Sequence, residues 1–211
     1  MLEHIPRWLG AAMRGLRAGA DKLCIAQLQG EFAAIDLSSP AFANGGRLPP
    51  RFTADGEGVS PPLVWGPVPE RAQSLALIVE DPDAPAREPF VHAIVWGLPR
   101  DTHRIEEGAI RADGSGSGGK DVGFNSYLFE GWLPPDPPTG HGEHQYAFQL
   151  FALSTSHGLR SNPGRSTLLK AMSGHVLAAG LLTGTYSRGE PAGSRGYAID
   201  RTAQIARQGG N

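Results

Sequence analysis

QYAFQLFAL, residues 145–153, is the clearest indication of architecture in this chain. In an extended strand, successive side chains alternate between two faces. One face would carry Tyr146, Phe148, Leu150 and Ala152, and the other Ala147, Phe151 and Leu153. Gln149 is the only clearly polar side chain among them, and a strand with two apolar faces is buried on both sides. We therefore expect this segment in a β-sheet that is covered on both faces.

Two further apolar runs predict strands. They are SLALIVED at 74–81 and PFVHAIVWGLP at 89–99. From residue 47 onward, such runs are separated by glycine and proline clusters, a pattern typical of a β-sandwich. Residues 101–144, which include DGSGSGGKD and WLPPDPPTGHGEH, form a long loop-like region. A loop of this length in a compact domain is usually functional or partly structured.

The C-terminal third changes its period. In STLLKAMSGHVLAAGLL, residues 166–182, apolar side chains recur at helical spacing, namely Leu168, Met172, Val176 and Ala179. This spacing predicts one or two helices, although Gly174 and Gly180 disfavour them locally. The polar tail after Gly184 is expected to run over the surface.

The composition excludes several classes of protein. The chain of 211 residues contains 29 glycines and 18 prolines, about 22% of the total against an average of about 12%. So many helix breakers exclude a helical bundle, while a hydrophobic content of 40% excludes a disordered chain. The net charge of −2 lacks the basic excess of a dedicated nucleic-acid-binding protein. Any partner is therefore expected to bind at a local pocket or patch.

The cysteine count and the N-terminus bear on the compartment. Cys24 is the single cysteine, so no intramolecular disulfide can form, and a free thiol indicates a reducing compartment. The N-terminal residues lack the unbroken apolar core of a signal peptide, and no window has the roughly 20 apolar residues of a membrane span. The sequence predicts a cytoplasmic location.

Residues 1–30 form a basic block that is expected to be an appendage to a single domain covering residues 31–211. A helix that begins at Pro6 would be amphipathic, with Leu9, Ala12 and Leu16 on one face and Arg7, Arg14 and Arg17 on the other. We expect this helix to dock on the protein itself or on a second subunit, in preference to a membrane surface or a disordered state. Deleting residues 1–20 would then weaken self-association without unfolding the sandwich.

Polar residues gather where the predicted strands end. Asp81 and Asp83 follow a buried strand in DPDAP, where an Asx-type turn between prolines would hold both carboxylates rigidly. His92 lies in the next strand, on the same face as Phe90, Ile94 and Trp96. His144 enters the third strand, two residues before Tyr146 on the same face. One aspartate and two histidines at strand ends could form a metal site, an acid/base pair or an anion pocket.

Three kinds of site have weaker support. Asp81, His92 and His144 could ligate zinc in a metal-assisted hydrolase, but none belongs to a short metal-binding spacing, and His141-x-x-His144 lies in a glycine-rich loop. Ser115 and Ser117 lack the strand that precedes a hydrolase nucleophile. GSGSGG at 114–119 follows no apolar strand and precedes no helix pattern, so it does not indicate a dinucleotide site.

Several separated motifs together resemble the phosphatidylethanolamine-binding protein family, in its bacterial Raf-kinase-inhibitor-like branch. They are DPDAP at 81–85, FVH at 90–92 and PPTGHGEHQY at 137–146. FTADGEGVSPPLVW at 52–65 resembles the stretch that opens bacterial members, and LLKAMSGHVLAAGLLTGTYSR at 168–188 resembles their closing helix and tail. The resemblance covers about residues 38–188 and leaves the N-terminal block outside.

The resemblance implies a mainly β fold, a sandwich of two antiparallel sheets with C-terminal helices, to which this chain adds the N-terminal amphipathic helix. It implies an anion pocket at one end, built by Asp81, His92, His144 and Tyr146, with Pro138 and Trp132 at its rim. It also implies homodimers, and a regulatory role toward a kinase or protease. The chain departs from the family where Gln145 replaces an arginine, Ala93 a tryptophan and Asp136 a cysteine.

These residues favour binding over catalysis. Two imidazoles can donate charge-assisted hydrogen bonds to a phosphate or carboxylate, and Asp81 could orient a histidine or pair with the ammonium of a zwitterion. Nothing in the sequence supplies an activated nucleophile or a cofactor site. The function predicted is that of a non-enzymatic protein that binds a small anion or phosphorylated headgroup, without catalytic residues, metal or cofactor.

Overall fold

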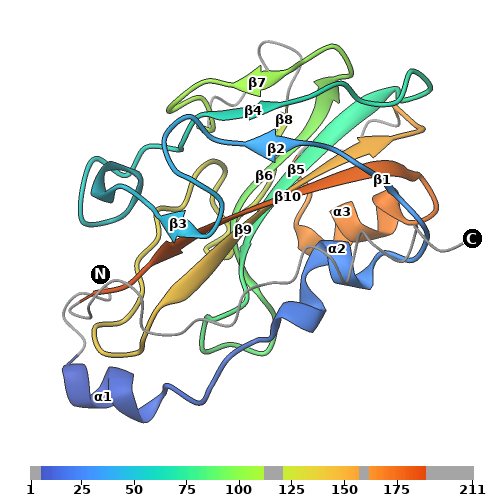
Figure 1. Ribbon diagram of the computed structural model, residues 1–211. Helices are drawn as coiled ribbons and strands as arrows, with labels where there is room; N and C mark the ends of the chain where they lie inside the picture. Colours follow the sequence, from blue (N-terminus) through green and yellow to red (C-terminus); the bar gives the residue numbers. More distant parts are fainter. Residues whose placement is uncertain (1–5, 112–120, 157–161, 189–211) are drawn as a thin grey trace, which may run out of the picture.

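The computed structural model describes residues 6–111, 121–156 and 162–188, which fold into two β-sheets and a few short helices (Figure 1). The larger sheet contains, in spatial order, β1 (Ala33–Ala34), β10 (Val176–Tyr186), β9 (His144–Leu153), β5 (Ser74–Asp81), β6 (Phe90–Pro99) and β8 (Asp121–Val122), and β3 (Gly46–Arg47) also pairs with β10. The smaller sheet contains β2 (Leu37–Ser38), β4 (Leu63–Trp65) and β7 (Arg104–Ile105). The helices are α1 (Arg7–Ala12), α2 (Cys24–Gln27) and α3 (Arg165–Met172), with 3-10 turns η2 (Ala20–Lys22) and η3 (Pro50–Phe52).

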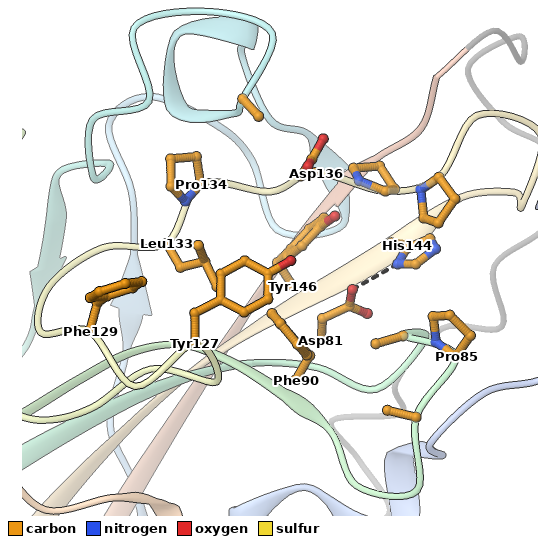
Figure 2. A pocket seen from close by; sticks show the side chains of 15 residues that line it. Asp81, Pro85, Phe90, Tyr127, Phe129, Leu133, Pro134, Asp136, His144 and Tyr146 are labelled. Carbon is orange, nitrogen blue, oxygen red and sulfur yellow. Dashed lines mark hydrogen bonds and ion pairs between the residues drawn. The ribbon is translucent and has the colours of Figure 1, made fainter. Parts of the chain in front are cut away.

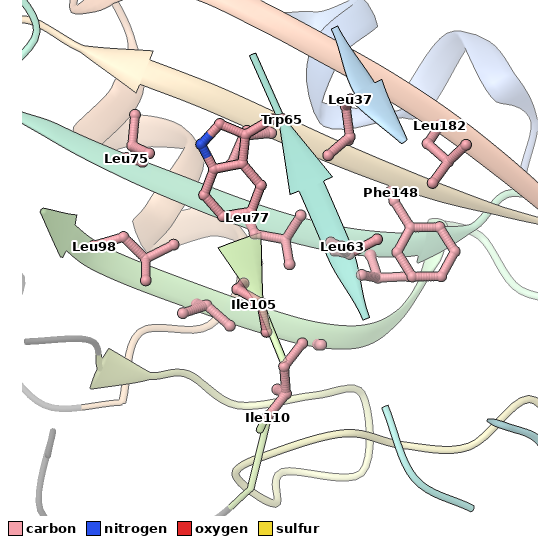
Figure 3. Packing of buried hydrophobic residues seen from close by; sticks show 14 of the residues in the cluster. Leu37, Leu63, Trp65, Leu75, Leu77, Leu98, Ile105, Ile110, Phe148 and Leu182 are labelled. Carbon is pink, nitrogen blue, oxygen red and sulfur yellow. The ribbon is translucent and has the colours of Figure 1, made fainter. Parts of the chain in front are cut away.

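The central strands are covered on both faces, as their apolar composition predicts. Every residue of β5 and β9 is buried. One face packs against the smaller sheet, where Phe148 and Leu77 meet Leu63 (Figure 3). The other face packs against the helices, where Phe151 joins a cluster with residues of α2 and α3. The core therefore has two layers, one on each side of the larger sheet.

Most strand pairs are antiparallel, as expected, but the short strands that pair with β10 at one edge of the larger sheet are parallel to it. β10, β9, β5 and β6 pair antiparallel, whereas β1 and β3 run parallel to β10. These two segments have two residues each, and β2, which lies between them in the chain, belongs to the smaller sheet. The chain thus crosses between the sheets at this edge.

Residues 176–186 form a strand, so the expectation of a second C-terminal helix is wrong. α3 ends at Met172, Gly174 turns the chain with φ +76°, and β10 then pairs with β9. A short apolar run at helical spacing also fits a buried strand, so periodicity alone could not separate the two structures.

Two glycines of β10 allow close packing that a helix would not need. A Cβ on Gly180 would lie 2.8 Å from the carbonyl oxygen of Ile35, and one on Gly184 would lie 2.5 Å from Cδ2 of Leu48. Both distances are too short for non-bonded atoms, so only glycine fits without displacement of its neighbours. Gly180, which disfavours a helix in the sequence, is thus a residue that the close packing of the strand requires.

The beginning of the C-terminal tail is also different from expectation. Thr185, Ser187 and Arg188 are buried instead of running over the surface. Thr185 belongs to β10, and the guanidinium of Arg188 contacts carboxylates described below. Polar character predicted exposure, but buried ion pairs and strand hydrogen bonds keep these residues inside.

The N-terminal helix is shorter than expected. Pro6 precedes α1 instead of opening it, and α1 ends at Ala12. Leu9 and Leu16, which were expected to form a packed apolar face, have exposed fractions of 37% and 60%. Gly10 is the buried residue of α1, because the helix approaches the loop at 139–141 by its backbone. The segment docks through polar backbone contacts and arginines.

Residues 20–28 join the core on the helical face of the larger sheet. Leu23, Cys24, Ile25 and Leu28 are all buried there. No helix among the described residues is long and apolar enough to cross a membrane. The GSGSGG stretch, with Ser115 and Ser117, lies outside the described residues.

Candidate functional site

A pocket of about 460 Å³ opens at the end of the larger sheet. Its polar groups belong to Asp81, Asp136, His144, Tyr146 and Tyr127, and most of the remaining lining is apolar. Figure 2 shows the aromatic side chains Phe90, Tyr127 and Phe129 on one side of the pocket and Asp81 with His144 on the other. The pocket can therefore take a ligand with a small polar end and an apolar part.

Antiparallel pairing brings the polar side chains to one edge. β5 ends at Asp81 and β9 begins at His144, and Glu80 of β5 lies opposite Ala147 of β9. The backbone N–H of Asp83 donates to Asp81 Oδ1 at 2.8 Å, which closes the Asx-type turn expected after β5. The turn and the strand pairing together fix the position of the Asp81 carboxylate.

Three hydrogen bonds link this carboxylate to the N-terminal segment. His144 Nδ1 lies 2.7 Å from Asp81 Oδ2. His144 Nε2 lies 2.7 Å from His141 Nδ1, and His141 Nε2 lies 2.9 Å from the carbonyl oxygen of Met13. Both imidazoles are buried. His141, which the sequence analysis considers only as a zinc ligand, is thus part of the site. Its position in the GHGEH stretch, three residues before His144, is the sequence feature that indicates this.

His92 lies behind the pocket rather than in its wall. Its Nδ1 donates to the carbonyl oxygen of Leu133 at 2.7 Å. Its ring packs edge-on against Tyr146, with ring centroids 5.1 Å apart. Among the described residues, neither His92 Nε2 nor the Tyr146 hydroxyl has a hydrogen-bond partner, although both atoms are buried. Buried polar atoms without a hydrogen-bond partner, such as these two, are unusual in a folded protein.

The two predicted rim residues occupy different places. Pro138 lines the pocket, as expected from the proline loop. Trp132 lines a neighbouring cavity of about 480 Å³ and donates from Nε1 to the carbonyl oxygen of Phe52 at 3.2 Å. Its ring lies 6.2 Å from that of His92, so it supports the site from behind.

Arg188 pairs with two carboxylates at the rim, a contact that the sequence does not predict. Its Nη2 lies 2.6 Å from Asp55 Oδ1, and its Nη1 pairs with Asp136, which lines the pocket. The negative charge of Asp136, where the family resemblance implies a cysteine, is therefore partly offset, because Arg188 shares its single positive charge between Asp136 and Asp55. No local pattern identifies this partner, because Arg188 and Asp136 are 52 residues apart.

Arg17 reaches the site from the N-terminal segment. It pairs with the buried carboxylate of Asp83, whose Oδ2 also accepts the backbone N–H of Gln145 at 2.7 Å. Burial and the nearby Asp81 raise the pKa of Asp83, and Arg17 partly offsets this effect. Gln145 stands where the family resemblance implies an arginine, and in this chain Arg17 brings a guanidinium to Asp83 from the N-terminal segment.

Burial and charge act in opposite directions on Asp81. Burial, the largest influence, would raise its pKa, but His144, His92 and the backbone N–H of Asp83 together hold the pKa below its ordinary value. Asp81 is therefore ionised at neutral pH. A buried carboxylate at the pocket floor attracts cations and repels anions unless its charge is cancelled.

Acidification is expected to destabilise the protein through His92. Burial lowers the pKa of His92, against an opposing effect of Asp81, so the unfolded chain takes up a proton first as the pH falls below about 6.5. Stability should be greatest above that pH and decline toward about pH 5. Urea unfolding of the wild type and of His92→Gln at several pH values measures this, with the exposed His103→Gln as control. A decline of equal size in all three proteins would contradict the assignment to His92.

The three residues considered as zinc ligands do not converge. Both ring nitrogens of His144 face Asp81 and His141, and Nδ1 of His92 faces the Leu133 carbonyl. In the part of the chain that the structure describes, no group of three or more His, Cys, Asp and Glu side chains is arranged to hold a metal ion. The arrangement does not favour a metal-assisted hydrolase.

Comparison with known proteins covers most of the chain. Residues 38–187 match the family model described as phosphatidylethanolamine-binding protein. A UPF0098 protein from Methanothermobacter thermautotrophicus is 41% identical over 155 residues, 74% of this chain and 100% of that protein. One from Chlamydia pneumoniae is 39% identical over 160 residues, 73% of this chain and 99% of that protein.

Solved structures agree with this match. CT736 from Chlamydia trachomatis, described as a phosphatidylethanolamine-binding protein homologue, is 35% identical with a TM-score of 0.66, covering 74% of this chain and 98% of that one. YbcL from E. coli, described as a member of the mammalian family of that name, is 28% identical with a TM-score of 0.69, covering 74% and 99%.

Proposed function

The chain belongs to the phosphatidylethanolamine-binding protein family, and we propose that its pocket binds a small phosphorylated headgroup without transforming it. The observation that carries this proposal is the Tyr146 hydroxyl, a buried donor with no partner among the described residues, on a side chain that lines the pocket. A phosphoryl oxygen would satisfy that donor. Hydrogen bonds to charged groups contribute about 1.5–3 kcal/mol each.

The charges of the pocket favour a zwitterion over a simple anion. The Asp81 and Asp136 carboxylates both line the pocket, so an ammonium group has acceptors there. In the neutral form, His92 donates from Nδ1 to Leu133, which leaves Nε2 as an acceptor rather than an anion donor. O-phosphoethanolamine combines an ammonium with a phosphoryl group and is therefore the headgroup we favour.

The apolar wall supports a ligand that extends beyond the headgroup. Ala84, Pro85, Phe90, Leu133 and Pro134 line the pocket next to its polar end. Pockets of 300–1,000 Å³ with mostly apolar walls and a few placed polar groups are typical of small-molecule sites. The carbon chain of a phospholipid or of a modified peptide would contact this wall. A regulatory role toward a kinase or protease, and self-association, remain predictions from the family resemblance.

Titration with O-phosphoethanolamine tests the proposal. The wild type is expected to bind at millimolar concentration or below, and Tyr146→Phe is expected to weaken binding about tenfold or more, because one hydrogen bond to a charged oxygen is lost. Tyr127→Phe is the matched control, since Tyr127 also lines the pocket but is 46% exposed. Equal binding by wild type and Tyr146→Phe, or no calorimetric signal from the wild type at millimolar ligand, would refute the proposal.

A further inference from the structure

The N-terminal segment, residues 7–19, contacts both loops that build the site although it lies outside residues 38–187, which the family model matches. At the loop after β5, the N–H groups of Ala18 and Gly19 donate to the carbonyl oxygens of Ala84 and Pro82 at 3.1 and 2.9 Å. At the loop before β9, Arg14 Nε donates to the carbonyl oxygen of Gly140 at 2.8 Å. Arg17 joins the two loops, because it pairs with Asp83 and also donates to the Glu143 carbonyl at 3.3 Å.

The hydrogen-bond chain that ends on this segment constrains the protons of the site. The Asp81 carboxylate accepts only, so His144 Nδ1 must carry a hydrogen. The Met13 carbonyl also accepts only, so His141 Nε2 must carry one. The remaining contact, 2.7 Å between His144 Nε2 and His141 Nδ1, needs a third hydrogen, because two lone pairs would repel at that distance.

Two neutral imidazoles carry only two N–H groups between them. Three hydrogen bonds therefore require the pair to hold one additional proton and a charge of +1. Burial and the neighbouring His144 lower the pKa of His141, so His141 is the neutral acceptor and His144 the imidazolium. The charge of His144 then cancels the charge of Asp81 at the pocket floor.

We propose that the N-terminal segment is a positioning element of the ligand pocket: the Met13 carbonyl holds His141 as an acceptor toward His144, which keeps His144 protonated and neutralises Asp81 for a phosphoryl ligand. The ligand part of this inference rests on the proposed function, whereas the protonation part does not. Other titratable or charged groups around the two rings are Asp83, His92, Arg14, Arg17 and Tyr146. Arg14 and Arg17 lie on the segment itself, so its displacement also removes their positive charges from the rings, an effect that by itself would raise the pKa of His141 and therefore opposes the expected decrease.

The Met13 carbonyl fixes the proton on His141 Nε2 because it can only accept a hydrogen bond, and a water molecule in its place would not have this effect. Water both donates and accepts, so a His141 ring released from Met13 could donate from Nδ1 to His144 and accept a water hydrogen at Nε2. This arrangement satisfies both rings without the additional proton. When the segment is displaced, the pair should therefore lose its proton at lower pH, and the Asp81 charge would again oppose a phosphoryl group.

Two glycines of the segment provide a matched pair of variants. A Cβ on Gly10 would lie 2.2 Å from the Thr139 carbonyl oxygen and 3.2 Å from the His141 nitrogen, both backbone atoms of the site loop. A Cβ on Gly15 would meet nothing within 4 Å. Gly10→Ala should thus displace the segment from the loop, while Gly15→Ala makes the same chemical change five residues later without a clash.

The test is nitrogen NMR of the histidine rings across a pH titration of the full-length protein. In wild type and Gly15→Ala we expect a charged His144 at neutral pH, and in Gly10→Ala a titration midpoint lower by at least about one pH unit. Arg14→Ala, which removes the Gly140 contact without a clash, should shift the midpoint in the same direction. A neutral His144 in the wild type at neutral pH, or equal midpoints in all four proteins, would overturn the inference.

Titration of the same proteins with inorganic phosphate and O-phosphoethanolamine separates this inference from the proposed function. We expect Gly10→Ala to bind inorganic phosphate about tenfold more weakly than Gly15→Ala at neutral pH, and to lose less affinity for O-phosphoethanolamine, whose ammonium can pair with the uncancelled Asp81. If the wild type binds and the ring titrations are equal, the positioning role is refuted and the function stands. If the ring titrations differ and the wild type binds neither probe, the positioning role stands and the function is refuted.

Discussion

Replacing Arg165 with alanine is expected to lower the free energy of unfolding by about 3–5 kcal/mol, because it leaves a buried carboxylate without its counter-charge. Glu80 is completely buried, and Arg165 Nε lies 2.5 Å from its Oε1. The same carboxylate accepts the backbone N–H of Cys24 at 2.8 Å and Nε2 of Gln149 at 2.7 Å. It thus joins α2, β9 and α3 on the helical face of the larger sheet.

Urea unfolding at neutral pH measures the effect. Lys170→Ala is the control, because Lys170 is an exposed residue of the same helix, and it should change stability by less than about 0.5 kcal/mol. Adding Glu80→Gln to Arg165→Ala should recover part of the loss by removing the uncompensated charge. A loss within about 1 kcal/mol for Arg165→Ala would mean that water or another cation reaches Glu80.

Replacing Arg188 with alanine is expected to cost about 2–3 kcal/mol and to weaken phosphoryl binding at the same time. The cost falls below that of a fully buried pair because 30% of the Asp55 side chain is exposed. Without the guanidinium, Asp136 would add an unbalanced negative charge to the pocket rim. The two effects have one cause, since Arg188 joins the rim loop to the end of β10.

The pH dependence of the Arg188 effect has a defined sign. Arg188 lowers the pKa of Asp55, so this pair contributes stability above about pH 4 that is lost as the pH falls further. The difference between wild type and Arg188→Ala should therefore shrink in acid. Arg104→Ala, which breaks a surface pair with Glu106, is the control and should cost less than about 1 kcal/mol. Equal losses from the two variants would contradict the role of Arg188.

The central strands could be predicted because their signal is local. β5 and β9 lie between two packed layers, and nearly every position is apolar, so composition alone indicates a covered strand. Residues 176–182 of β10 belong to the stretch predicted to form one or two helices, because its apolar residues fit both periods. What separates the two structures is the pairing with β9 and the close approach at Gly180 and Gly184, and both are tertiary contacts.

The residues of the candidate site also fall into two groups, those whose place the sequence predicts and those whose place only the tertiary structure decides. Asp81 and His144 are expected together from the sequence because both lie at predicted strand ends and the family resemblance implies one pocket. The antiparallel pairing of β5 with β9 brings them to one edge. His92 was expected in the wall but lies behind it, since the Leu133 carbonyl holds its ring away from the cavity. Which side of a strand end faces a pocket depends on loops whose path has no local signal.

The amino-acid sequence alone was enough to predict a β-rich chain, its family resemblance and the residue types at the pocket. The tertiary structure decided the charge of that pocket. Arg188 lies 133 residues from Asp55, and His141 lies 128 residues from Met13, so no periodicity or motif links them. Because charges act through space at contact distances that only folding creates, a carboxylate in the sequence does not reveal whether its charge is free or cancelled.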